Sequence, residues 1–223
     1  PWAQNADIGT AETPDLLACL LSEAVSLREM AFYLRDAEAE AECAEYAEGY
    51  AAALELLWDG ERYSYRDRDT HETGAGRVLF ADAPADASLF LAEPLDPPAR
   101  LLIALHGGAE QTPRFSLTVE GLDANGQPLR EDLGPGQIVW THSRGTLTTQ
   151  AVFSVVNALH PVGLSRVFRM SGATVDWSRR DINALLPLWA AALPAKRVDQ
   201  LLAYYQAALR VPIVSKSHCM NSR

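Results

Sequence analysis

The stretch YSYRDRDTHETG, Tyr63–Gly74, lies where the hydrophobic periodicity of the chain changes. Before it, apolar residues recur at steps of three and four, which is typical of helices. After Gly74 they fall in short or alternating runs, which is typical of strands. The stretch packs two tyrosines, two arginines, two aspartates, a histidine and a glutamate together. It can be interpreted as a metal loop, a sugar-binding loop or a solvated turn between two structural parts.

Two helices are predicted upstream of this stretch. Thr13-Pro14-Asp15 combines a hydroxyl N-cap, a proline at the first helical position and an acid near the positive end of the helix dipole. A second helix is expected from about Asp36 to Trp58, and the short connection predicts an antiparallel αα-hairpin. The residues expected to be buried are Leu16, Leu20, Ala24, Leu27, Ala31 and Leu34 in the first helix and Ala39, Cys43, Tyr46, Tyr50, Leu54 and Leu57 in the second. Cys19 and Cys43 are interpreted as small buried thiols.

Short apolar runs follow Gly74 at intervals near ten residues, separated by Gly, Pro, Asn and Asp. This spacing predicts an antiparallel sandwich or barrel, and Asn125-Gly126 predicts a hairpin within it. Helical periodicity returns at Asp181, is expected to break at Pro187, and resumes after Pro194. The predicted class is therefore α+β: helical hairpins interrupted by an antiparallel β-sandwich-like insertion. The expected domains are residues 1–75 (helical hairpin), 76–176 (β-rich) and 177–223 (helical hairpin and polar tail).

The charge balance restricts the partners. A net charge of −10 over 223 residues disfavours nucleic acid and anionic membranes, and no apolar run is long enough to span a bilayer. The opening, PWAQNADIGTAETP, has no signal-peptide pattern, which favours a cytoplasmic location, and reads like a cut into a longer protein. The oligomeric state is left open.

Metal and esterase chemistry are each considered and disfavoured. Asp67 and Asp69 begin like a calcium loop, but the glycine and final glutamate of such a loop are missing. The five histidines show no metal-ligand spacing, so neither a metal site nor a cofactor is predicted. His106-Gly107-Gly108 resembles an esterase oxyanion turn, yet the sequence contains no Gly-x-Ser-x-Gly elbow.

The helical segments carry a resemblance to a known group of enzymes. Leu57-Trp58-Asp59 is followed by Tyr63-Ser64-Tyr65 and Asp67, and Pro187-Leu188-Trp189-Ala190 comes much later. In this order they resemble the (α/α) toroid, or six-hairpin, glycoside hydrolases, which include trehalases, glucoamylase-like enzymes and glycoside hydrolase family 63. The resemblance covers under half of the chain, and the β-rich region departs from it.

The resemblance implies part of a glycosidase acting on α-linked glucosides, with one carboxyl as general acid and another activating water to give inversion. Neither of the family's catalytic motifs is found, so no catalytic residue is assigned, and this chain alone is expected to be inactive. Trp2, Tyr65 and Asp67 are the expected carbohydrate-binding residues. Trp177 and Trp189 are further aromatics near the ends of elements. The alternative is a non-catalytic β-sandwich that binds carbohydrate or a protein and is flanked by helices.

Overall fold

The computed structural model describes residues 4–107, 114–190 and 193–208. The chain divides into two compact units, each built from two separate segments. The sheet unit comprises Pro1–Leu16 and Ser64–Ala184, and the helix unit comprises Leu17–Tyr63 and Leu185–Arg223. Residues 64–75 and 177–184 therefore belong to the same unit as the strands of the central region.

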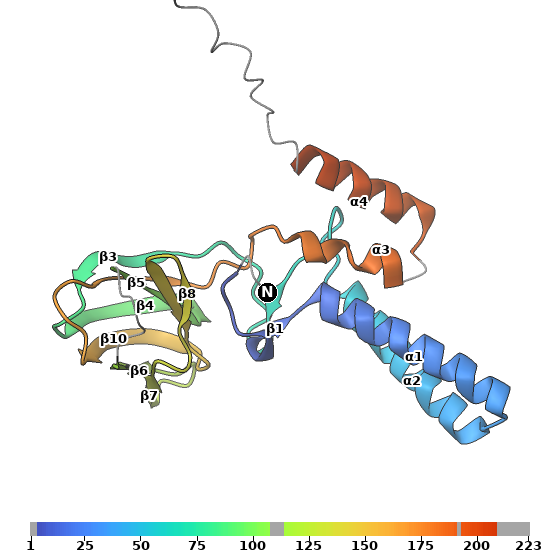
Figure 1. The fold of residues 1–223 in the computed structure, drawn as a ribbon, viewed down its shortest axis with the longest axis horizontal. Helices are drawn as coiled ribbons and strands as arrows, with labels where there is room; N and C mark the ends of the chain where they lie inside the picture. Colours follow the sequence, from blue (N-terminus) through green and yellow to red (C-terminus); the bar gives the residue numbers. More distant parts are fainter. Residues whose placement is uncertain (1–3, 108–113, 191–192, 209–223) are drawn as a thin grey trace, which may run out of the picture. The chain divides into compact units, whose positions relative to one another are not determined.

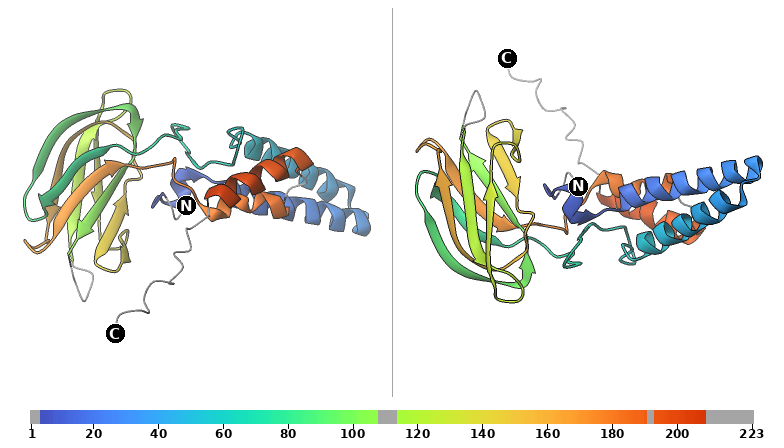
Figure 2. Two further views of the ribbon diagram at one scale, coloured as in Figure 1. Left: turned by 90° about the horizontal axis from the view of Figure 1, so that it is seen from above. Right: turned by 90° about the horizontal axis from the view of Figure 1, so that it is seen from below.

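The sheet unit contains two larger antiparallel sheets (Figures 1 and 2). One has the order β4-β10-β6-β7 and the other β3-β11-β5-β9-β8. Their strands are β3 (Val78–Pro84), β4 (Leu89–Ala99), β5 (Leu101–His106), β6 (Ser116–Leu122), β7 (Pro128–Leu133), β8 (Val139–Thr141), β9 (Arg144–Thr148), β10 (Phe153–Val162) and β11 (Arg169–Thr174). The antiparallel sandwich expected from the ten-residue spacing is thus confirmed.

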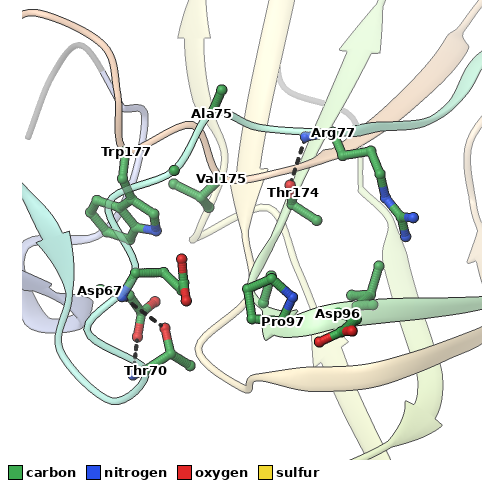
Figure 3. A pocket seen from close by; sticks show the side chains of 13 residues that line it. Asp67, Thr70, Ala75, Arg77, Asp96, Pro97, Thr174, Val175 and Trp177 are labelled. Atoms are coloured by element: carbon green, nitrogen blue, oxygen red, sulfur yellow. Dashed lines mark hydrogen bonds between the residues drawn. The ribbon is translucent and has the colours of Figure 1, made fainter.

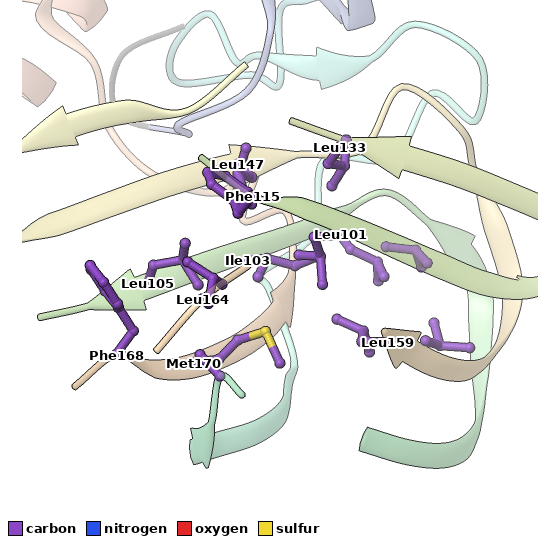
Figure 4. Close-up of a cluster of buried hydrophobic side chains, with 14 of the residues drawn as sticks. Leu101, Ile103, Leu105, Phe115, Leu133, Leu147, Leu159, Leu164, Phe168 and Met170 are labelled. Carbon is purple, nitrogen blue, oxygen red and sulfur yellow. The ribbon is translucent and has the colours of Figure 1, made fainter. Parts of the chain in front are cut away.

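The hydrophobic core of this unit lies between the two sheets (Figure 4). Alternate residues of β5, Leu101, Ile103 and Leu105, point into it and are at most 1% exposed. Leu117 and Val119 of β6 enter from the other sheet and are fully buried. The alternation follows from the two-residue period of a strand, which puts every second side chain on one face.

Two local sequence features are explained by position in the sheets. Strand β4 contains Pro94, Pro97 and Pro98 and lies at the edge of its sheet, where missing N–H donors are tolerated. The hairpin predicted at Asn125-Gly126 is confirmed: it joins the paired strands β6 and β7, and Gly126 has φ +76°. A left-handed conformation of this kind favours glycine.

The N-terminal segment is part of the sheet unit. It forms η1 (Ile8–Thr10) and β1 (Ala11–Glu12), and β1 pairs with β2 (Arg66–Asp67). The Thr148 hydroxyl donates to the Asn5 carbonyl at 2.5 Å, which fastens the segment to strand β9.

The helix unit contains α1 (Pro14–Leu34, whose first residues belong to the sheet unit), α2 (Ala37–Glu55), α3 (Pro187–Ala190) and α4 (Ala195–Ala208). The 3₁₀ helix η2 (Ile182–Leu185) precedes Pro187, where the predicted break is confirmed. Asp36 caps α2 by accepting from the Ala39 N–H at 3.1 Å. Helices α1 and α2 lie side by side as the expected antiparallel hairpin (Figures 1 and 2).

The predicted burial of α1 was partly wrong. Leu16, Leu27 and Leu34 are exposed, and so is Cys19, which was expected to be a buried thiol. The buried side chains are Ala18, Leu21, Ala24 and Ala31. Because α1 is apolar on several faces, three-four spacing alone could not select the buried one. On α2, Tyr46 is likewise exposed rather than buried.

The mixed α+β class with antiparallel sheets is confirmed. None of the helices within the described residues is long and apolar enough to cross a bilayer.

Candidate functional site

The stretch that separates the two periodicities folds as a turn organised by Asp67. One carboxylate oxygen of Asp67, Oδ1, accepts from the backbone N–H groups of Asp69 at 2.9 Å and Thr70 at 3.1 Å. The Asp67 N–H donates to the Glu72 carbonyl at 3.0 Å, and its carbonyl accepts from His71 at 2.9 Å. A short acidic side chain that closes a turn on the amides following it is a typical Asx arrangement. The turn is therefore ordered by its own polar groups.

Arg100, the residue immediately before β5, holds this turn against the sandwich. Its Nε atom lies 2.9 Å from the second carboxylate oxygen of Asp67, and the two side chains are 0% and 2% exposed. The same guanidinium donates to the Asp69 carboxylate and to the Gln150 carbonyl. Hydrogen bonds from Arg68 and Arg100 lower the pKa of Asp69 although its partial burial opposes the shift. The carboxylates of the turn thus compensate a buried positive charge.

A cavity of about 130 Å³ lies beside the turn (Figure 3). Asp67, Thr70 and Trp177 lie on one side, and Asp96, Pro97 and Thr174 on the other (Figure 3). Glu72, Gly74, Ala75, Arg77, Leu95, Ala99 and Val175 complete the lining. The walls come from the turn, from β4 and from the segment after β11, so the cavity belongs to the sheet unit alone.

The polar groups of the cavity differ in their freedom to bind a ligand. The Asp67 carboxylate is occupied by Arg100 and by two backbone amides. The Arg77 side chain pairs with Glu93, at 3.3 Å between Nη2 and Oε1. Within the part of the chain that the structure describes, the carboxylates of Glu72 and Asp96 enter no ion pair, so they are the groups available to accept from ligand hydroxyls.

Trp177 forms an apolar wall. Its backbone N–H donates to the Gly74 carbonyl at 3.0 Å, and the residue is only 4% exposed. Since so little of the indole is accessible, it can contact one edge of a ligand but cannot serve as an open stacking platform.

Of the three residues expected to bind carbohydrate, only Asp67 is among the residues that line the cavity. The carboxylate of Asp67 is engaged by Arg100 and by backbone amides, so this residue supports the turn rather than offering a free ligand group. Tyr65 is 1% exposed and is not among the lining residues, and Trp2 lies outside the described residues. Glu72 and Asp96 were missed as lining residues. Glu72 stands in the polar stretch Tyr63–Gly74, whereas nothing in the sequence distinguishes Asp96.

The motif around Trp58 and Tyr63 packs against Arg197 of α4, an arrangement called the brace below. The Arg197 guanidinium of α4 donates to both carboxylate oxygens of Glu55, at 2.5 and 2.7 Å, and to the Tyr63 hydroxyl at 3.3 Å. The Trp58 and Tyr63 rings meet edge to face, with centroids 5.1 Å apart. Trp189 is exposed. These contacts show that Trp58 and Tyr63 have a structural role in the packing of the helix unit.

The sheet that contains His106 differs from the sheet that an α/β-hydrolase esterase requires. His106 ends β5, which is antiparallel to both β11 and β9, whereas the oxyanion turn of an α/β-hydrolase belongs to a mostly parallel sheet. The His106 ring Nε2 lies 3.0 Å from the Ser171 hydroxyl on the neighbouring strand. Gly108 lies outside the described residues.

Five carboxyl groups of the described residues have a clearly displaced pKa, and in each the pKa is lowered: Glu55, Asp69, Asp82, Asp132 and Asp176. Hydrogen bonds to the carboxylates, mostly from arginines, are the main cause in the first four. In Asp176 burial opposes the shift and is outweighed by hydrogen bonds from Ser178 and Arg179. A glycosidase general acid needs a raised pKa, so these five carboxyls do not suit that role.

Comparison with known proteins adds no assignment: no family model, curated protein or solved structure matches this chain.

Proposed function

We propose that this chain is a non-catalytic part of an (α/α) toroid glycoside hydrolase acting on α-linked glucosides, in which the sheet unit contacts carbohydrate. The observation that carries the proposal is the cavity beside the Asp67 turn, where the carboxylates of Glu72 and Asp96 share the lining with Trp177. Carboxylates accept strongly from hydroxyl groups, and an aromatic wall suits the apolar edge of a sugar ring.

The cavity is suited to a small portion of a saccharide. Its volume of about 130 Å³ suggests a single sugar ring or the end of a chain. The Thr70 and Thr174 side chains also line it and extend the set of polar groups around the carboxylates. Because Arg100 and Asp67 fix the turn before any ligand arrives, little ordering would be needed on binding.

The toroid part of the proposal is supported by the helical hairpin and by the motifs at its end. Helices α1 and α2 are antiparallel, and Trp58 and Tyr63 close the turn after α2 against Arg197 of α4. In this proposal the two catalytic carboxyls belong to a longer enzyme of which this chain is a part. The reaction there would invert the anomeric centre, with one carboxyl protonating the leaving oxygen and another activating water.

Ligand titration tests the binding part of the proposal. In ¹H-¹⁵N NMR spectra of the full 223-residue chain, maltose and isomaltose should shift amide signals of residues 67–77 and 174–177, with a dissociation constant of about 1 mM. Glu72→Gln should weaken binding by about five- to tenfold because a charge-assisted hydrogen bond is lost. Glu38→Gln, on the exposed surface of α2, is the matched control and should leave the affinity unchanged.

Three results would contradict the proposal in different ways. If tens of millimolar of either sugar leaves these signals in place, the cavity does not bind carbohydrate. If the chain by itself hydrolyses α-glucosides rapidly, the catalytic pair lies within it and the non-catalytic assignment is wrong. A binding module unrelated to glycosidases would show the shifts and bind α-linked and β-linked disaccharides, such as cellobiose, without preference.

A further inference from the structure

The last turn of helix α1, from Met30 to Leu34, consists only of apolar and aromatic residues. Ala31 is buried, but its neighbours Phe32, Tyr33 and Leu34 are 63%, 81% and 79% exposed. Met30 and Leu27, about one and two turns before Leu34, are exposed as well. A helix that is apolar on all sides is normally covered on all sides. The end of α1 therefore presents more apolar surface than the described part of the helix unit covers.

A groove of about 620 Å³ lies beside these side chains. Phe32 and Tyr33 of α1 form one part of its lining, and three alanines of α2 form another. Ala37, Ala41 and Ala44 follow at steps of four and three, so they share one face of α2. Because alanine side chains are short, a third helix can approach that face closely while its larger side chains fill the groove.

The negative charge of the residues around the groove favours a positively charged binding partner. Helix α2 contains six glutamates and no lysine or arginine. Residues 17–63 contain eleven acidic and three basic residues, a net charge of −8 within the chain's total of −10. A second copy of this hairpin would bring the same negative charge against it, which is unfavourable. An anionic partner of any kind meets the same repulsion.

We infer that the groove between α1 and α2 docks a cationic amphipathic helix of a partner protein. The apolar face of that helix would cover Phe32 and Tyr33 and lie on the alanine face of α2. Its lysines and arginines would face Glu29 and Glu40, which also line the groove; with Arg28, the lining holds two acidic residues and one basic residue. Recognition of an amphipathic helix by a groove of this kind uses apolar anchors at helical spacing, with charge setting the specificity. The inference does not depend on carbohydrate binding by the sheet unit.

Fluorescence anisotropy with a defined peptide pair tests this inference on the full chain. The probe is a labelled leucine-lysine peptide of about 18 residues, long enough to form an amphipathic helix. Its twin has every lysine replaced by glutamate and the same leucines. The leucine-lysine peptide should bind with a dissociation constant of about 10 μM, and at least tenfold more weakly in about 0.5 M salt because exposed charges are screened.

Variants locate the binding surface. Ala41→Arg should weaken binding of the leucine-lysine peptide at least tenfold, because it adds bulk and positive charge to an exposed position in the groove. Tyr33→Ser should weaken it by removing an apolar anchor. Phe90→Ser, which changes an equally exposed aromatic residue in the sheet unit, is the matched control and should have no effect. Circular dichroism of each variant checks that its helix content is retained.

Three outcomes would overturn the inference. The first is that the leucine-lysine peptide fails to bind, and the second is that its glutamate twin binds equally well. The third is that sedimentation shows self-association that the peptide displaces, which would assign the surface to a second copy of this chain.

Discussion

The guanidinium carbon of Arg197 lies 4.7 Å from the ring centroid of Trp58, which joins helix α4 to the turn that follows helix α2. The same side chain pairs with Glu55 and donates to Tyr63, so one residue from the second segment of the helix unit contacts three residues of the first. A cation above an indole ring combined with a bidentate carboxylate contact is a specific arrangement that lysine cannot reproduce.

Replacing Arg197 is therefore expected to weaken the helix unit. Arg197→Ala should lower the free energy of unfolding by about 1–2 kcal/mol, since the cation–π contact and the partly exposed ion pair are both lost. Arg197→Lys should recover less than half of this loss. Urea unfolding followed by circular dichroism measures both variants. Equal stability of Arg197→Ala and the parent chain would show that the brace is energetically neutral.

The Glu55–Arg197 pair also predicts a dependence on pH. The hydrogen bond from Arg197 lowers the pKa of Glu55 below its ordinary value of 4.5. The ionised carboxylate is thus favoured in the folded state, and its contribution is present above pH 4.5 and is lost as the pH falls through the lowered pKa. The stability difference between the parent chain and Glu55→Gln should shrink below pH 4.5. A difference that stays constant down to pH 3 would contradict this linkage.

Asp67 is predicted to matter for stability more than for direct ligand contact. Asp67→Ala leaves the buried Arg100 guanidinium with one carboxylate fewer and frees two backbone amides, and should cost about 3–5 kcal/mol. Asp69→Ala removes a half-exposed partner of the same arginine and should cost less than half of that. Thermal unfolding of the two variants ranks them. If Asp69→Ala proves the more damaging, the assignment of Asp67 as the main partner is wrong.

The Asp67–Arg100 pair provides a test of whether the strand-rich region, residues 76–176, folds stably without the rest of the chain. A segment of residues 76–176 keeps the buried Arg100 but loses both carboxylates that compensate it. This segment is expected to unfold at a lower temperature than the sheet unit of the full chain. Arg100→Met in the same segment should raise its melting temperature, because an apolar side chain of similar length removes the uncompensated charge. In the full chain, Arg100→Met should raise the melting temperature by less or not at all.

Replacement of glycine by alanine is predicted to change stability in opposite directions at Gly121 and Gly49. A Cβ atom on Gly121 in β6 would lie 2.0 Å from the Val155 carbonyl oxygen of the paired strand, so Gly121→Ala should destabilise the sheet unit by more than about 2 kcal/mol. For Gly49 in α2, no atom of the described residues outside the neighbouring helix backbone lies within 4 Å of such a Cβ, and Gly49→Ala should stabilise the helix by about 1 kcal/mol. Chemical denaturation of both variants checks the contrast.

The sequence predicted the strands better than the faces of the helices. The run RLLIALH forms β5, in which the five apolar residues from Leu101 to Leu105 are all buried, so both faces of this strand are covered. Strand β9, with glycine and threonines, was not predicted, since its place is set by pairing with β5 rather than by its own pattern. On α1, Leu27 and Leu34 belong to an apolar surface that the described residues leave exposed, and no local rule distinguishes such a surface from a core.

The cavity could be anticipated only in part. Asp67 was singled out because it belongs to the Tyr63-Ser64-Tyr65 and Asp67 motif that carries the resemblance to toroid glycosidases. Its partner Arg100 lies far along the chain, and buried arginine is rare enough that sequence reasoning does not expect it. Asp96 reaches the cavity from an edge strand, which depends on the order of strands in the sheet. Contacts of this kind follow from tertiary structure alone.

The two units are joined by three passages of the chain, after residues 16, 63 and 184. This arrangement bears on how the protein is made. During synthesis, strand β1 emerges long before its partner β2, and the sheet unit is incomplete until residue 184 has left the ribosome. The α1–α2 hairpin likewise waits for α4 and Arg197. Neither unit can therefore complete before residues near or beyond 184 have been synthesised, and the apolar end of α1 is exposed during that time.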